Sequence, residues 1–190
     1  MATKIQWNAT PTLYIIIAIS LLTLPIRWVA AWFLAVAVHE SAHYIALRSM
    51  GCSVFSVVLG ATGVKMNTAQ LNGWKEVLCS AAGPLMSLSL GFMGSIFPRL
   101  ALCGFAQGIF NLLPIYPMDG GRILNGILGR FRFGKAVGRA VEVSVLLGLG
   151  ILAIYGWLHL SLGPLPLVLF AFMLLRTRKI PCKAGQFAVQ

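Results

Sequence analysis

Acidic side chains are almost absent from this sequence: Asp and Glu together number 4 among 190 residues, and all charged residues make up 10%. A soluble domain carries roughly 25% charged residues, so the composition excludes an ordinary soluble globular domain. With 58% apolar residues in long runs, the chain is instead predicted to be a polytopic membrane protein, with one domain over residues 1–190. No cleaved signal peptide is expected.

Cysteine is also rare, and its four copies show no C-x-x-C spacing. We expect all four thiols to be reduced and structural. The cysteines are Cys52, Cys79, Cys103 and Cys182.

Basic residues give a net charge of +11 and stand at the ends of apolar runs. This placement favours contact with the lipid bilayer and its anionic headgroups, and we expect no nucleic-acid partner. About six transmembrane helices are predicted in a mostly all-α fold. They run over 12–26, 28–49, 75–97, 99–116, 140–158 and 160–175.

In this arrangement all Lys and Arg residues except Arg27 and Arg99 fall on one side of the membrane. The positive-inside rule then predicts a multi-pass cell-membrane protein whose N- and C-termini are both cytoplasmic. Residues 51–73 differ from the spans, because they are rich in Val, Ser and Thr and are punctuated by Gly60 and Gly63. We expect a short membrane-associated β element there, lying against protein or a wet cavity.

The second span contains the letters HESAH, which fit the pattern H-E-x-x-H. His39 and His43 share one helix face, where two imidazoles can bind one zinc ion. Glu40, one position further, is the natural general base for a metal-bound water. Ionisable groups inside a membrane span are costly and are functional candidates by default, although a buried histidine can also be a plain core residue.

A catalytic zinc ion usually takes a third protein ligand. Glu76 reads as an interfacial charge, Glu142 as a partner of nearby Arg139, and His159 belongs near the far side of the membrane. Asp119 remains. Because the second and fourth spans run in the same direction, HESAH and Asp119 are both expected in the cytoplasmic leaflet.

Asp119 lies in the stretch FNLLPIYPMDGGRIL, residues 110–124. Pro114 and Pro117 are expected to end the fourth span, and Gly120 and Gly121 to allow an unusual tight backbone. We therefore expect the Asp119 carboxylate on an irregular segment inside the protein or beside water. A plain turn between helices is the alternative.

HESAH followed by NLLPIYPMDGG resembles the site-2 protease family of intramembrane zinc metalloproteases, peptidase family M50. The nearest resemblance is to the stage IV sporulation protein FB type. The resemblance covers most of the chain, including TPTLYIIIAISLLT before HESAH and AAGPLMSL at 81–88. It implies a protease core in the spans at 28–49, 75–97 and 99–116.

The resemblance also implies residue roles. His39, His43 and Asp119 would hold one Zn²⁺ ion, Glu40 would be the catalytic base, and Asn111 would position substrate or stabilise the oxyanion. The β element would receive an unwound substrate by strand addition. The implied substrate is a membrane-embedded or membrane-tethered protein such as a pro-sigma or anti-sigma factor. A homo-oligomer or a regulatory membrane partner is left open.

Two features depart from the family pattern. Many members have Asn where this chain has Ser87, three residues after Pro84, which puts a polar role at that position in question. No CBS domain and no PDZ insertion are expected, since the chain stops soon after the sixth predicted span.

Three other functions stay open at this point. A divalent-metal transporter would need further polar ligands, and the chain has only 3 histidines. A catalytically inactive relative would bind membrane proteins without cleaving them. Prenyl-protein proteases use H-E-x-x-H with a downstream Glu ligand, for which Glu142 is poorly placed.

Overall fold

The computed structural model describes residues 6–60, 63–68, 71, 73–159, 164–178 and 187–189. Lys4, Lys179, Cys182, Lys183 and the start of the predicted sixth span at 160–163 lie outside the described residues. The elements, in order, are β1 (Gln6–Ala9), α1 (Pro11–Thr23), α2 (Ile26–Ser49), β2 (Val54–Gly60), β3 (Gly63–Thr68), α3 (Trp74–Ser89), η1 (Leu90–Met93), α4 (Pro98–Asn111), α5 (Asp119–Leu128), α6 (Gly134–His159), α7 (Leu165–Arg178) and β4 (Phe187–Val189).

Proline residues set several helix boundaries. Pro11 and Pro98 are the first residues of α1 and α4, where a missing backbone N–H costs no hydrogen bond. Leu24 precedes Pro25 and is extended, which ends α1. α2 then begins directly after Pro25. The break between the first two predicted spans therefore follows from one proline.

Among the described helices, three are long and apolar enough to cross a membrane: Ile26–Ser49, Trp74–Met93 and Gly134–His159. They correspond to the predicted spans at 28–49, 75–97 and 140–158. α1 and α4, with 13 and 14 residues, are shorter. The structure thus shows a mostly helical membrane protein, and the count of six spans stays a prediction.

The region around Asp119 differs from expectation. The predicted fourth span at 99–116 stops at Asn111, and a separate helix, α5, begins at Asp119 itself. The prediction that Asp119 lies on an irregular segment was wrong. The irregular segment that contains the prolines ends at the residue before Asp119. Asp119 is the first residue of a helix, so its backbone is fixed by the helical hydrogen bonds that follow.

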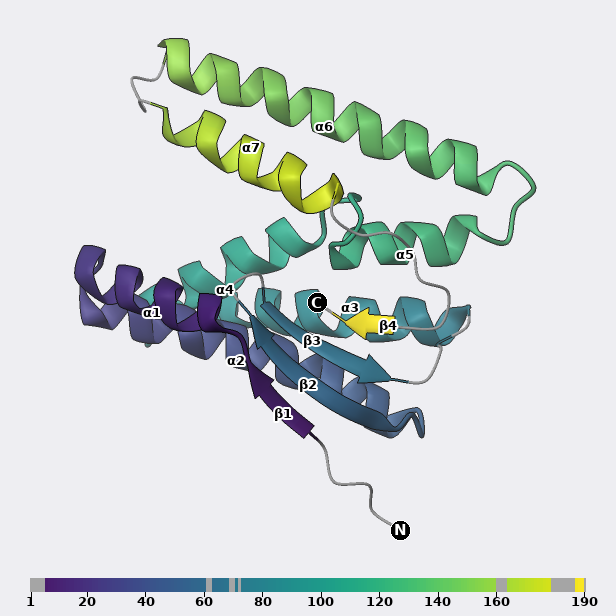
Figure 1. The fold of residues 1–190 in the computed structure, drawn as a ribbon, viewed down its shortest axis with the longest axis horizontal. Coiled ribbons are helices and arrows are strands. Elements are labelled where there is room, and N and C mark those ends of the chain that lie inside the picture. The colour runs from purple at the N-terminus through teal and green to yellow at the C-terminus, as the bar shows by residue number, and fades with distance from the viewer. Residues whose placement is uncertain are drawn as a thin grey trace.

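A four-stranded sheet has the order β1-β2-β3-β4. β2 and β3 lie within 51–73, where a short β element was predicted, and they pair antiparallel. β1 adds parallel to β2, and β4 adds antiparallel to β3. The two outer strands were not predicted, since four and three residues carry too little pattern. The sheet lies along α2 and α3 (Figure 1). Between them is an apolar core: Leu47, Val54, Val57, Met66, Leu71 and Cys79.

Helices α6 and α7 form an antiparallel pair on the side of the molecule away from the sheet (Figure 1). The pair meets the rest of the protein through a small apolar cluster. Met173 of α7 packs there with Ile115 and Met118 from the turn before α5, and residues of α6 complete the contact. The last two helices therefore support the segment that leads into Asp119.

Candidate metal centre

The two histidines of HESAH lie on the buried face of α2. His39 is 1% exposed and His43 is fully buried, and their rings meet edge to face. The Nε2 atoms of the two rings are 3.2 Å apart. The i,i+4 spacing has therefore produced the convergence that the sequence predicted.

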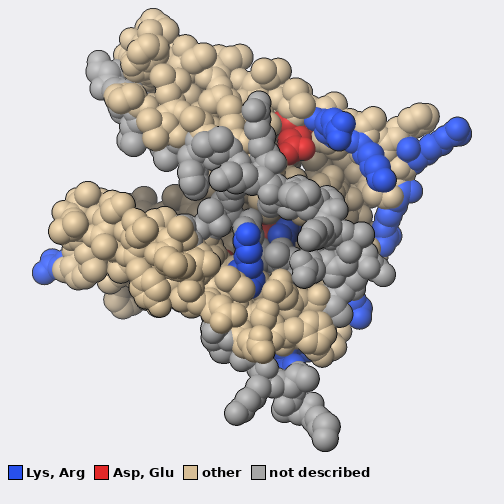
Figure 2. Space-filling model, in the orientation of Figure 1, with Lys and Arg blue, Asp and Glu red and all other residues tan. Residues whose placement is uncertain are grey.

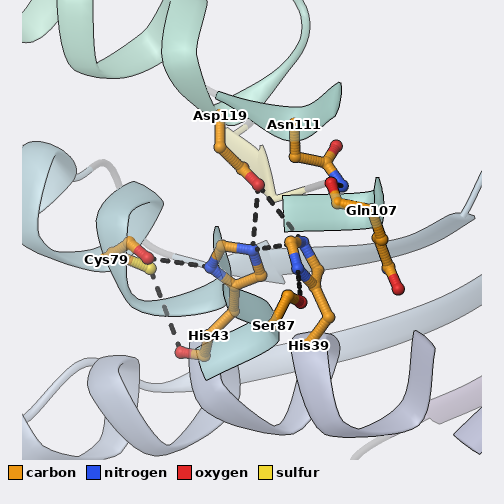
Figure 3. A network of polar contacts seen from close by, with 7 residues as sticks. All are labelled: His39, His43, Cys79, Ser87, Gln107, Asn111 and Asp119. Atoms are coloured by element: carbon orange, nitrogen blue, oxygen red, sulfur yellow. Dashed lines mark hydrogen bonds and ion pairs between the residues drawn. The ribbon is translucent and has the colours of Figure 1, made fainter. Parts of the chain in front are cut away.

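Asp119 reaches the same point from α5. Its Oδ2 atom lies 3.2 Å from Nε2 of His39 and 3.3 Å from Nε2 of His43 (Figure 3). All three side chains are buried, and together they form a group that could hold a metal ion. Residues far apart in the sequence thus present two nitrogens and one oxygen to a single point.

The spacing and the chemistry of these three atoms fit a cation with tetrahedral coordination. Ligand bonds of about 2.0–2.1 Å place neighbouring ligands of a tetrahedral zinc ion roughly 3.3 Å apart, which is the spacing seen here. Neither carboxylate oxygen of Asp119 has a hydrogen-bond partner, although both are buried. Burying an unpaired carboxylate is costly, and a bound cation would offset that cost.

The outer nitrogens of the two imidazoles are held by α3. Nδ1 of His43 donates to the backbone carbonyl of Cys79 at 2.8 Å, and Nδ1 of His39 lies 2.8 Å from the Ser87 hydroxyl (Figure 3). A carbonyl can only accept, so Nδ1 of His43 carries the proton and its Nε2 offers a lone pair. Such outer contacts fix the tautomer and orientation of metal-ligating histidines.

Ser87 is the residue whose polar role the sequence left in question. It is fully buried and contacts His39 directly. Its position three residues after Pro84 was the available signal, but only the packing of α3 against α2 reveals the partner. Cys79 gave no signal, because its backbone carbonyl makes the contact with His43.

Three glycines near the site are needed for close approach. A Cβ atom at Gly83 would overlap the imidazole of His43, so α3 can lie against α2 only with glycine there. Cβ atoms at Gly120 and Gly121 would overlap the backbone of the preceding turn. The prediction of an unusual backbone at Gly120 and Gly121 was therefore wrong, because both residues are helical. Glycine is needed at these positions for close packing.

The stretch between α4 and α5 contains both predicted prolines. Pro114 and Pro117 lie in turns and bends, and the Tyr116–Pro117 peptide bond is cis. Pro117 is fully buried. The fourth predicted span therefore ends before these prolines, as expected, and the stretch that contains them leads into α5, which was not predicted.

Glu40 opens onto a cavity beside the three-residue group. Its side chain is largely buried, Oε2 has no hydrogen-bond partner, and the backbone N–H of Val64 in β3 donates to the carboxylate. The cavity, of about 730 Å³, lies among α1, α2, α4 and the β2–β3 pair. Asn111 lines it as well, and its side-chain amide donates to the backbone carbonyl of Gln107 at 3.1 Å.

The remaining acidic and imidazole groups lie elsewhere. Among the residues that the structure describes, one group of histidine, cysteine or acidic side chains could hold a metal ion, and it consists of His39, His43 and Asp119. Glu76, Glu142 and His159 are not in this group, as the sequence predicted. Cys52, Cys79 and Cys103 are free thiols.

Comparison with known proteins adds independent observations. Residues 90–155 match the family described as Peptidase family M50. The chain is 27% identical over 178 residues to the zinc metalloprotease MJ0392 of Methanocaldococcus jannaschii, covering 84% of this chain and 52% of that protein. The chain thus spans about half the length of this curated relative.

The fold also matches a solved structure, the site-2 protease from Methanocaldococcus jannaschii. The TM-score is 0.65 at 22% identity, covering 92% of this chain and 91% of that one. The arrangement is therefore that of a membrane protein with a buried three-ligand centre between helices. The chain is thus similar to peptidase family M50 over residues 90–155, and its fold is similar to that of a site-2 protease.

Proposed function

We propose that the chain is an intramembrane zinc metalloprotease that hydrolyses peptide bonds of membrane-embedded or membrane-tethered proteins. One observation carries the proposal: the His39, His43 and Asp119 ligand atoms converge next to Glu40, at the wall of an apolar cavity. Apolar walls suit a substrate segment that comes from lipid. The narrower proposal of a sporulation-branch enzyme acting on a pro-sigma factor rests on the NLLPIYPMDGG stretch alone.

The residues divide the chemistry as follows. His39, His43 and Asp119 would hold the zinc ion, which would supply a Lewis acid for the peptide carbonyl. Glu40 takes a proton from that water as its oxygen bonds to the carbonyl carbon. As the carbon–nitrogen bond breaks, Glu40 returns the proton to the leaving amine. The unpartnered Oε2 of Glu40 is free for this task.

Two further groups are proposed to bind the substrate. Asn111 has a second amide hydrogen besides the one given to Gln107, and it could donate to the developing oxyanion. The outer edge of β3 is proposed to pair with an extended substrate strand. β4 pairs with Met66–Thr68 on this edge, so a substrate strand at these residues would take the place of β4.

The membrane arrangement is proposed to have six spans with both termini in the cytoplasm, and one protease domain over residues 1–190. Figure 2 shows Lys and Arg side chains gathered toward the end of the molecule where α5 connects to α6. Arg130 and Arg132 lie in that connection, and Lys135 and Arg139 lie in the first turns of α6. A basic surface at one end supports a cytoplasmic position for that end.

Co-expression with candidate membrane substrates tests the function. The wild-type chain is expected to cleave at least one substrate in a panel of pro-sigma factors, anti-sigma factors and signal-peptide remnants. Glu40→Gln should abolish cleavage and keep the zinc content. Cleavage by Glu40→Gln at the wild-type rate would remove Glu40 as the base. Metal flux into liposomes without any cleavage would favour the transporter alternative.

A further inference from the structure

Gln107 carries a buried polar atom that nothing in the proposed chemistry uses. It lies on α4, one turn before Asn111, and its side chain lines the same cavity as Glu40. Its Oε1 atom is buried and has no hydrogen-bond partner. Figure 3 shows the side-chain amides of Gln107 and Asn111 leaving the same helix. An amide oxygen kept dry and unpaired is costly unless a ligand supplies a donor.

The opposite wall of the cavity is the β2–β3 pair. Val64 pairs with Leu59 of β2, and its backbone N–H donates a hydrogen bond to Glu40. This part of β3 therefore faces the candidate metal centre. A substrate strand added to β3 would therefore run between β3 and α4. α4 is fixed there by its packing against α2 and α3.

A substrate strand has two edges, and β3 can form backbone hydrogen bonds with only one of them. The N–H and C=O groups on the second edge would face an apolar cavity, where unpaired backbone groups are costly. Residues four apart on a helix rise about 6.0 Å. Peptide groups on one edge of a strand recur every two residues, or about 6.6–6.8 Å. The rise from Gln107 to Asn111 along α4 is thus close to the repeat of peptide groups on the second edge.

We propose that Gln107 binds the main chain of the unwound substrate: its Oε1 accepts a hydrogen bond from a backbone N–H two residues along from the group that faces Asn111. The inference rests on the proposed protease function and extends it. The substrate is then held from both edges, by β3 on one side and by two side-chain amides on the other. Because main-chain groups are read, recognition depends on extension of the segment more than on its side chains.

The test uses a synthetic transmembrane peptide that the wild type cleaves in detergent micelles. Around the scissile bond, single backbone amides are replaced in turn by esters, which removes one N–H at a time. We expect one ester position to raise the wild-type KM about five- to tenfold. Gln107→Met, which keeps shape but removes the acceptor, should raise KM similarly for the all-amide peptide and should not respond to that ester.

Controls separate this effect from a structural one. Gln6→Met makes the same chemical change at an exposed glutamine of β1 and should leave KM and the ester profile unchanged. Gln107→Met should keep the zinc content of the wild type. If Gln107→Met does not fold, Gln107→Asn takes its place, since its amide is one methylene shorter and withdraws from the substrate.

The outcomes distinguish the two proposals. A wild-type chain that contains zinc but cleaves neither the substrate panel nor the peptide overturns the protease function. A wild type that cleaves, while the Gln107 variant keeps the wild-type KM, overturns the role of Gln107. The same holds if every ester position costs the variant as much as it costs the wild type.

Discussion

The hydroxyl of Ser87 lies 2.8 Å from Nδ1 of His39, so a residue of α3 orients an imidazole that belongs to α2. Both groups are buried, and water cannot replace the contact without rearrangement. The Ser87 hydroxyl therefore stabilises the ring position in which Nε2 faces Asp119.

Removing this hydroxyl should weaken metal binding. Ser87→Ala is expected to lower zinc affinity about 10- to 100-fold, which is the usual cost of losing an outer partner of a histidine ligand. Competition with a fluorescent zinc chelator measures it. Ser89→Ala is the matched control, because Ser89 is exposed and bonds only to Met86 on its own helix. Equal affinities in the two variants would contradict the role of Ser87.

The third ligand can be checked by metal content. Asp119→Ala should lose most of the bound zinc, since the two imidazoles alone leave a weaker site. Glu142→Ala should retain it, because Glu142 is outside the ligand group. Elemental analysis of both purified proteins gives the answer. Zinc loss in the Glu142 variant and not in the Asp119 variant would show that Glu142, and not Asp119, is the third ligand.

Close packing at Gly83 predicts a large effect from one methyl group. Gly83→Ala should destabilise the fold by roughly 1–3 kcal/mol and displace the His43 ring, because the added Cβ would occupy the same space. Gly148→Ala on α6 is the control, since nothing lies within 4 Å of a Cβ there. Thermal unfolding in detergent compares the two variants. A Gly83 variant as stable as the wild type would show that α3 can shift away from α2.

Asn111 is predicted to act on the transition state. Asn111→Ala should reduce kcat by about 10²–10³, as loss of an oxyanion donor does, and leave zinc content unchanged. Single-turnover cleavage of the peptide substrate measures the rate. A normal kcat with a raised KM would instead assign Asn111 to substrate binding alone.

Much of this site follows from the sequence, for a physical reason. His39 and His43 are neighbours on one helix, so local geometry suffices to bring them together. Asp119 could be found because so few other acidic residues compete for the role. Ser87, Gln107 and the Cys79 carbonyl could not be assigned, because each acts through a contact between helices whose relative rotation no short pattern encodes.

The fold was predictable to a similar degree. Apolar runs located α2, α3 and α6, and Pro25 explains the break after α1. α5 was missed because its short pattern sits among glycines that disfavour helices, and packing against the preceding turn, α3 and α6 holds it. β1 and β4 were missed because their pairing partners are distant in the sequence.

The ligand atoms come from α2 and α5, which are separated along the chain by β2, β3, α3 and α4. A fragment that contains HESAH alone therefore has two imidazoles and no site. Zinc affinity becomes a reporter of native tertiary structure, because the third ligand arrives only when α5 docks. For a protein that must be handled in detergent, metal stoichiometry would count the correctly folded molecules in a preparation before any substrate is known.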